Sequence, residues 1–141
     1  MSVSKLDDQL CFALYSASSQ VTKIYRPLLE RLGLTYTQFL VLMALWQKDN
    51  VSISQLAVKV GLSKATMTPL LKRLEQKELI LRETLNDNER QKNIVLTDKG
   101  KNMSEQSGEI TDKAFCSTGL SKKQADTIIE ICGQIVRNAE G

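Results

Sequence analysis

Three cysteines and three tyrosines are the side chains of this sequence that are best suited to reactive chemistry. Cys11 lies in the apolar segment 9–15, and Tyr15 follows four residues later, which places both on one face of a helix. Tyr25 and Tyr36 come further along the chain. A cysteine reacts as its thiolate, and a phenolic hydroxyl that donates a hydrogen bond stabilises that form. The pattern predicts a reactive thiol at Cys11 with the three tyrosines as its partners, although a lone cysteine on an apolar helix is also typical of core packing.

The position of Tyr25 favours a contact between two chains. On one continuous helix Tyr25 would lie about 21 Å from Cys11, at about 1.5 Å per residue. Tyr25 cannot reach Cys11 of its own chain unless the helix folds back, but it can reach the partner's Cys11 in an interlocked dimer.

The rest of the composition argues against most enzyme classes. The 141 residues include no histidine, which is the commonest general base and metal ligand. The cysteines lack the close spacing of a zinc site, and there is no glycine-rich phosphate loop, so we expect no cofactor and no metal. A thiol peroxidase is disfavoured, because the sequence has no Cys-x-x-Cys motif and no thioredoxin-like alternation of strands and helices. We therefore expect a protein that is not an enzyme.

The sequence also predicts a cytoplasmic location and no membrane partner. No apolar run approaches the roughly 20 residues that a membrane span needs, and the N-terminus lacks the basic and then apolar order of a secretion signal. In a reducing compartment the cysteines are expected to rest as thiols.

The first half of the chain predicts helices separated by turns. A helix is expected from Ser4 to about Lys23, with Pro27 as a kink or interruption and Gly33 as a stop. Thr35 and Gln38 have the spacing of a capping box. The elements expected next are a buried helix at 39–47, an edge strand at 51–53, a helix at 55–60 capped by Ser54, a turn at 61–62, and a helix capped by Ser63 that runs to about residue 77 with Leu70, Leu71 and Leu74 inward.

The second half predicts a hairpin and two more helices. Strands are expected at 79–84 and 93–96, with the polar segment 85–92 as the loop between them. Thr97 caps a helix to about Phe115, and Ser121 and Gln124 open the last helix with a second capping-box spacing. This last helix carries the apolar stripe Ile128, Ile129, Cys132 and Ile135.

This order predicts a mainly helical (α+β) fold built around a winged helix-turn-helix unit. The terminal helices carry more apolar surface than one small core needs, which favours a homodimer over a lone domain that covers these stripes internally. Residues 59–101 carry ten Lys and Arg against six Asp and Glu, whereas residues 102–141 carry four against six. The basic middle of the chain is where a surface that contacts phosphates is expected.

A DNA-reading helix needs small, polar or basic side chains at its first turns, and a wing contributes basic side chains beside the groove. The candidate residues on the second helix of the unit and in the hairpin are Ser63, Lys64, Ala65, Thr66, Thr68, Pro69, Lys72, Arg82, Arg90 and Lys92.

Several segments in order resemble the MarR family of repressors: LTYTQF at 34–39, LA at 56–57, GLS at 61–63, TMTPLLKRLE at 66–75 and VLTDKG at 95–100. The resemblance implies an obligate dimer on pseudo-palindromic double-stranded operator DNA. It also implies dimerisation helices at about 1–34 and 98–141, and a winged helix-turn-helix at about 35–97 with its wing at about 79–97. The family usually has Asp-x-Arg in the wing, whereas this chain has Asn88 two residues before Arg90. Asp87 can substitute for the missing carboxylate.

Cys11, Tyr15, Tyr25 and Tyr36 fall where the organic-hydroperoxide-resistance (OhrR) branch of this family has its sensor cysteine and tyrosines. That resemblance implies oxidation of Cys11 by an organic hydroperoxide to a sulfenic acid, and a disulfide with a second cysteine of the other subunit. Cys116 fits the second position, while Cys132 is the alternative and is expected to pack in the dimer interface. The disulfide would move the dimerisation helices and release the operator.

Two other functions stay open from the sequence. A repressor of the same fold can release DNA when a small phenolic or lipophilic ligand binds at the dimer interface, without cysteine chemistry. A purely structural or protein-binding module is the other alternative, and a salt-dependent affinity for DNA would exclude it.

Overall fold

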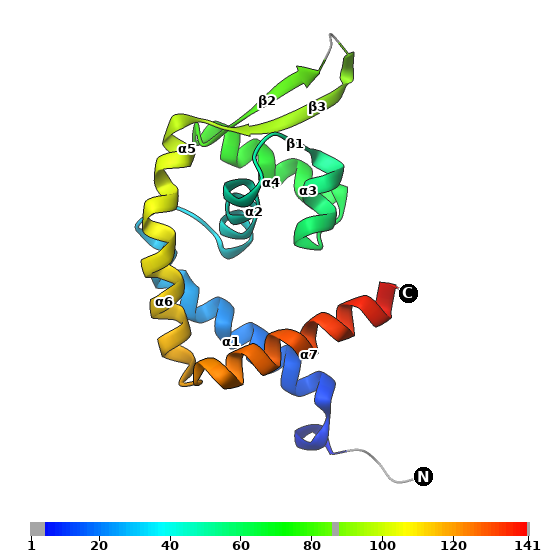
Figure 1. The fold of residues 1–141 in the computed structure, drawn as a ribbon, viewed down its shortest axis with the longest axis vertical. Helices are drawn as coiled ribbons and strands as arrows, with labels where there is room; N and C mark the ends of the chain where they lie inside the picture. The colour runs from blue at the N-terminus through cyan, green and yellow to red at the C-terminus, as the bar shows by residue number, and fades with distance from the viewer. Residues whose placement is uncertain (1–4, 86–87, 141) are drawn as a thin grey trace.

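The chain is a mainly helical, elongated molecule with a small sheet at one end (Figure 1). The computed structural model describes residues 5–85 and 88–140, without the side chains of 85 and 88–91. The hairpin of β2 (Ile80–Leu85) and β3 (Asn88–Leu96) lies at one end of the long axis. The helices α2 (Tyr36–Gln47), α3 (Ile53–Val60) and α4 (Lys64–Gln76) follow, and α1 (Leu10–Glu30), α6 (Ser107–Thr118) and α7 (Lys122–Glu140) lie towards the other end. The predicted fold class is confirmed.

The first long helix, α1, spans Leu10–Glu30 and follows a short 3-10 turn at Leu6–Asp8. Of the two predicted effects of Pro27, a kink or an interruption, the interruption is wrong, because α1 continues through Pro27 to Glu30. A proline inside a helix removes one backbone hydrogen bond, and the packing of Leu28 and Leu29 on the core holds the last turn in place. Gly33, with φ +67°, lies in the turn that follows α1.

The core is centred on α2, which spans Tyr36–Gln47 and is apolar on nearly every side, as predicted. Thr35 and Gln38 form the predicted capping box, with each side chain accepting from the backbone N–H of the other residue. Phe39, Leu42 and Leu45 are fully buried. α2 therefore fixes the relative positions of the elements that pack around it.

The helix-turn-helix consists of α3 (Ile53–Val60) and α4 (Lys64–Gln76). The prediction that Ser54 caps the first of these helices is wrong, because Ser52 forms a capping box with Gln55 and α3 begins at Ile53. Gly61 takes the left-handed conformation at φ +72° and ends α3. Ser63 caps α4 as predicted, and the predicted inward face of Leu70, Leu71 and Leu74 is buried.

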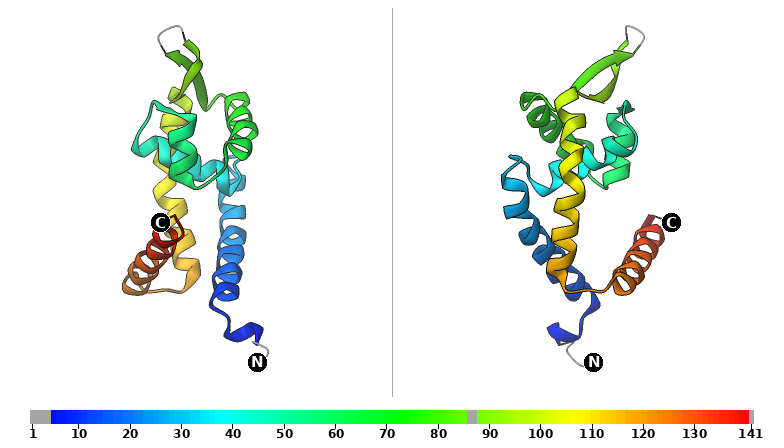
Figure 2. Two further views of the ribbon diagram at one scale, coloured as in Figure 1. Left: turned by 90° about the vertical axis from the view of Figure 1, so that its right-hand side faces the viewer. Right: turned by 60° about the vertical axis from the view of Figure 1, so that its left-hand side comes forward.

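The wing is an antiparallel hairpin of β2 (Ile80–Leu85) and β3 (Asn88–Leu96). A third short strand, β1 (Val51–Ser52), pairs with β3, so the sheet order is β1-β3-β2 and β1 is at an edge, as expected. The predicted loop at 85–92 is too long, because β3 already begins at Asn88. Asn88 pairs with Leu85 and Lys92 with Thr84, with an irregularity between these two pairs, and the hairpin extends away from the helices (Figure 2).

Three helical segments follow the sheet before the last helix. Thr97 caps α5 (Asp98–Asn102) as predicted, but the single helix expected up to Phe115 is divided. A 3-10 segment at Met103–Gln106 joins α5 to α6 (Ser107–Thr118), and α6 packs against α1.

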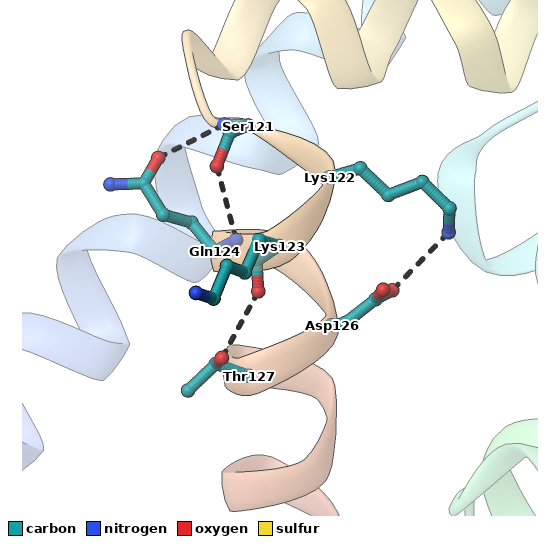
Figure 3. Close-up of polar contacts among 6 residues, drawn as sticks. All are labelled: Ser121, Lys122, Lys123, Gln124, Asp126 and Thr127. Carbon is teal, nitrogen blue, oxygen red and sulfur yellow. Dashed lines mark hydrogen bonds and ion pairs between the residues drawn. The ribbon is translucent and has the colours of Figure 1, made fainter.

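The last helix, α7, spans Lys122–Glu140. The second predicted capping box is present at its start: Ser121 Oγ accepts from the N–H of Gln124 at 3.2 Å, and Gln124 Oε1 accepts from the N–H of Ser121 at 2.9 Å (Figure 3). None of its residues is buried within the chain, and both views of Figure 2 show α6 between α7 and α1.

Candidate DNA-binding face and thiol sensor

The first turns of α4 present small and hydroxyl-bearing side chains on one exposed face. Ser63 Oγ accepts from the N–H of Thr66 at 3.1 Å and donates to Thr66 Oγ1 at 3.0 Å, while Thr68 Oγ1 donates to the carbonyl of Lys64 at 3.0 Å. Met67 is buried and anchors this turn to the core. The predicted contact residues on this helix are all exposed: Ser63, Lys64, Ala65, Thr66, Thr68, Pro69 and Lys72. This surface has the chemistry of a recognition helix, with donors and acceptors ordered before a ligand arrives.

Arg82 holds the base of the wing against α4. Its side chain is 22% exposed, its Nη2 donates to the carbonyl of Thr68 at 3.4 Å, and its Nε lies 3.9 Å from Glu75 Oε1. The sequence predicted that Arg82 flanks the minor groove; in this structure its guanidinium packs on α4, and its contact with DNA stays a prediction. Its place therefore indicates a role in setting the angle between β2 and α4.

The other wing candidates differ in how far the structure describes them. Lys92 is exposed on β3, opposite Thr84. The backbone of Arg90 lies in β3, but its side chain and that of Asn88 are outside the described part of the structure, as is Asp87 altogether. The predicted contact of Arg90 with the minor groove stays a prediction.

A close backbone contact ties the base of the wing to the C-terminal helices. Gly100 of α5 is buried, and a Cβ atom at this position would lie 2.2 Å from the carbonyl oxygen of Leu79. The indole N–H of Trp46 donates to the carbonyl of Gly100 at 2.9 Å, and Thr97 Oγ1 donates to the carbonyl of Glu78 at 2.7 Å. The start of α5 is thus fixed both to α2 and to the segment between α4 and β2.

Tyr25 of α1 and Tyr36 of α2 form a packed pair. Their ring centroids are 4.7 Å apart, and Tyr25 also contacts Phe39 at 5.9 Å between centroids. Burial raises the pKa of both phenols above the usual value, and the neighbouring Tyr36 raises that of Tyr25 further. Both side chains therefore stay neutral hydrogen-bond donors across the physiological pH range.

The cysteines lie away from this tyrosine pair along the chain. Cys11 is exposed at the start of α1, fourteen residues before Tyr25 on one continuous helix, and the structure gives no hydrogen bond between them among the described residues. Tyr15 is 71% exposed and lines a hollow on α1 with Ser18, Ser19, Thr22, Lys23 and Arg26. One chain therefore brings Tyr25 and Tyr36 together, but it does not assemble the whole predicted sensor pocket.

The second sensor candidate is on α6. Cys116 is exposed two residues before the end of this helix, and Cys132 is half-buried on α7. All three cysteines are free thiols in this structure. Since α6 packs against α1, the two helices that carry the predicted redox cysteines are in contact.

Sequence reasoning missed two polar residues at the centre of the molecule. Gln38 is buried, and its Oε1 accepts from Lys77 Nζ at 3.0 Å in addition to its capping bond. The two residues are 39 positions apart, and no local pattern joins them. Only the capping-box spacing pointed to Gln38.

Two further findings concern the described residues alone. No helix among residues 5–85 and 88–140 is long and apolar enough to cross a membrane. Within the same ranges, no three His, Cys, Asp or Glu side chains gather in a way that could hold a metal ion.

Comparison with known proteins places this arrangement in a family. The model of the MarR family matches residues 34–92, the segment from the start of α2 into the wing. The chain is 37% identical over 127 residues to the organic hydroperoxide resistance transcriptional regulator of Bacillus subtilis, which covers 90% of this chain and 84% of the relative.

Two solved structures of AbfR, a protein of Staphylococcus epidermidis, have the same fold. Reduced AbfR bound to DNA is 32% identical with a TM-score of 0.77, covering 95% of this chain and 93% of that one. Disulfide-formed AbfR is 31% identical with a TM-score of 0.63, covering 96% and 90%. The chain belongs to the MarR family of transcriptional regulators.

Proposed function

We propose that two copies of this chain form a repressor that binds a pseudo-palindromic operator and releases it when an organic hydroperoxide oxidises Cys11. The observation that carries the proposal is the pair of exposed thiols on the packed helices α1 and α6, at Cys11 and Cys116. The relatedness to a hydroperoxide-resistance regulator and to a protein solved in reduced and disulfide forms supports the same interpretation.

The dimer rests on the terminal helices, at about 1–34 and 98–141. The apolar side chains of α7 are not covered within the chain: Ile129 is 69% exposed, and Ile128 and Ile135 are exposed on the same helix. A helix face on which several large apolar side chains are exposed together is typical of a subunit interface. Two winged units at about 35–97 would then each contact one half-site, about 34 Å apart.

On DNA, α4 would enter the major groove. The exposed hydroxyls and Lys64 at its first turns would meet base edges and phosphates, and Lys72 would contact the backbone. The wing at about 79–97 would bring Lys92 and Arg90 beside the minor groove. Arg82 would contribute to DNA binding indirectly, because its bond to the carbonyl of Thr68 holds the wing against α4.

The redox step balances with the hydroperoxide as the only oxidant. One oxygen is transferred from the hydroperoxide to the Cys11 thiolate, giving a sulfenic acid, and the remaining alkoxide takes a proton and leaves as the alcohol. The thiol of the partner's Cys116 then attacks the sulfenic sulfur, and a disulfide and one water are formed. Tyr25 and Tyr36, which stay protonated, would donate to the sulfur of the partner's Cys11.

The disulfide would act on DNA binding through the anchored start of α5. Drawing α1 of one subunit towards α6 of the other would displace α5. Because the backbone of Gly100 is in close contact with that of Leu79, the base of the wing would move with α5. The spacing of the two recognition helices would then no longer match the half-sites. This structure, in which the cysteines are free thiols, is more similar to reduced AbfR on DNA and to overoxidised AbfR on DNA than to disulfide-formed AbfR, so it represents the DNA-binding side of the proposed switch.

A non-reducing gel tests which thiols pair. After hydroperoxide, the wild type is expected to run as a linked dimer, Cys11→Ser and Cys116→Ser as monomers, and Cys132→Ser as a linked dimer. A mixed dimer of Cys11→Ser with Cys116→Ser retains one Cys11 and one Cys116 in different chains, and it is expected to form the link. An oxidised wild type that has lost the thiols of Cys11 and Cys116 but still runs as a monomer would put the bond within one chain, and loss of the link in Cys132→Ser would give the pairing role to Cys132.

A further inference from the structure

Gln38 is the buried polar side chain in the core of the described residues, at 4% exposure. It stands in the first turn of α2, two residues after Tyr36, which packs on Tyr25. Its side-chain oxygen accepts two hydrogen bonds, from the N–H of Thr35 at 3.2 Å and from Lys77 Nζ at 3.0 Å. A buried amide needs such partners, because a buried polar atom that has lost its hydrogen bond destabilises the folded state.

Lys77 is the C-cap residue of the recognition helix and connects three parts of the chain. Its backbone N–H donates to the carbonyl of Arg73, which closes α4. Its ammonium donates to Gln38 and to the carbonyl of Gly33, in the turn between α1 and α2. Its own carbonyl accepts from Lys99 Nζ of α5 at 3.1 Å. The end of α4 is therefore bonded to the α1–α2 turn and the start of α2 on one side, and to α5 on the other.

These contacts are suited to transmit a displacement. An ammonium is a compact charge with three donors, and two of them are used here by acceptors at the start of α2 and in the turn that precedes it. A shift of Tyr36 at the start of α2 carries Gln38 with it, since both are in the same helical turn. Lys77 must then either follow, which moves the end of α4, or lose its partners in a half-buried position.

We infer that Lys77 is the positioning residue that couples the tyrosine pair to the recognition helix, so that a change at Tyr36 alters operator affinity through Gln38 and Lys77. The inference deepens the proposed function, and the part of it that concerns oxidation rests on that function. Lys77 does not itself need to contact DNA, and its side chain is directed to the α1–α2 turn.

The first test is a double-mutant cycle that needs no oxidant. Operator affinity is measured by fluorescence anisotropy for the reduced wild type, Lys77→Met, Tyr36→Ala and the double variant, with a duplex selected from a random pool. Tyr36→Ala is expected to weaken binding about tenfold when Lys77 is present, and much less in the Lys77→Met background, since coupling of this kind is typically about 5–150-fold. Effects that add within about twofold would overturn the inference.

The second arm uses oxidation and includes matched controls. Lys77→Met is expected to form the disulfide on a non-reducing gel as the wild type does, yet to show a ratio of oxidised to reduced operator Kd that is about tenfold smaller. Lys77→Arg, which keeps the donors, is expected to restore the wild-type ratio. Lys101→Met, the same change at an exposed position of α5, is expected to leave the ratio unchanged.

The outcomes separate the inference from the proposed function. If Lys77→Met weakens reduced and oxidised binding by the same factor, Lys77 is only structural and the inference fails. If the wild type keeps its operator after oxidation while the double-mutant cycle is still non-additive, the proposed redox function fails and the coupling through Lys77 stands. Melting temperatures of all variants show whether a lost effect reflects unfolding.

Discussion

At the scale of single residues, the structure divides the basic side chains near α4 into two kinds. Lys72 is exposed on the recognition helix, whereas Arg82 is packed between β2 and α4. A surface lysine can neutralise a phosphate, but an arginine bonded to the carbonyl of Thr68 is already engaged.

Substitutions of Lys72 and of Arg82 should therefore have different effects on DNA binding and on stability. Lys72→Ala is expected to lower the slope of log Kd against log salt by about one and to leave the melting temperature unchanged. Arg82→Ala is expected to lower the melting temperature and to change the salt slope less, because it loosens the wing. Operator titrations at several salt concentrations and thermal melts check both, and equal salt slopes for the two variants would contradict this division.

The tyrosine pair makes a prediction about pH. The pKa of Tyr25 and of Tyr36 is raised in the folded chain, so the folded state favours the protonated phenols. Their contribution to stability is present below the unfolded value, near pH 10, and is lost as the pH rises through the folded values.

Alkaline titration followed by ultraviolet absorbance checks this expectation. In the wild type, some tyrosines should ionise at a pH above the usual range for this side chain. Tyr36→Phe should remove part of this late ionisation. It should also lower the pKa of Tyr25, because Tyr36 is one of the two causes that raise that pKa. The same late ionisation in a Tyr25→Phe, Tyr36→Phe double variant would rule out the assignment.

At the scale of elements, the junction between α4 and β2 carries a conformation that favours glycine. Glu78 has φ +62°, in the left-handed region. Glu78→Gly is expected to stabilise the fold by about 1 kcal/mol, because a side chain with a Cβ is strained there. Gln76→Gly, two residues earlier and still in α4, is expected to destabilise it by about 1 kcal/mol. Denaturant unfolding measures both, and a loss of stability in Glu78→Gly would contradict the expectation.

Local patterns in the sequence predicted most elements and their caps. Thr35, Ser63, Thr97 and Ser121 all begin helices as expected, because a cap depends on residues only three positions apart. The start of α3 was placed at the wrong serine, although Ser52 and Gln55 have the capping-box spacing as well.

The errors and omissions arise where packing over long distances overrides local preference. Pro27 stays inside α1 because the last turn of that helix is held by the core. The length of β3 depends on its pairing with β2, and the link between Gln38 and Lys77 joins residues 39 positions apart. The chemistry of the sensor residues was predictable from their types, but their grouping was not, because one chain brings only Tyr25 and Tyr36 together.

At the scale of the whole molecule, α7 predicts the oligomeric state. Its apolar face is uncovered within the chain, so a single copy would expose it to water. Ile128→Asp is expected to convert the dimer to monomers at micromolar concentration and to weaken operator binding at least about 100-fold, because one half-site cannot supply the affinity of two. Gln134→Asp adds the same charge to a polar position of α7 as a control. Sedimentation velocity decides, and a persistent Ile128→Asp dimer would exclude α7 from the interface.

The central claim is that oxidation of Cys11 releases the operator, and one titration tests it most directly. Binding of a labelled operator duplex is followed by anisotropy for the wild type and for Cys11→Ser, before and after one equivalent of an organic hydroperoxide and again after a thiol reductant. The account predicts that the wild-type Kd rises about tenfold or more and returns on reduction. It also predicts no rise for Cys11→Ser, whose hydroxyl cannot form a sulfenic acid. Release by Cys11→Ser, or tight binding by the fully oxidised wild type, would contradict it.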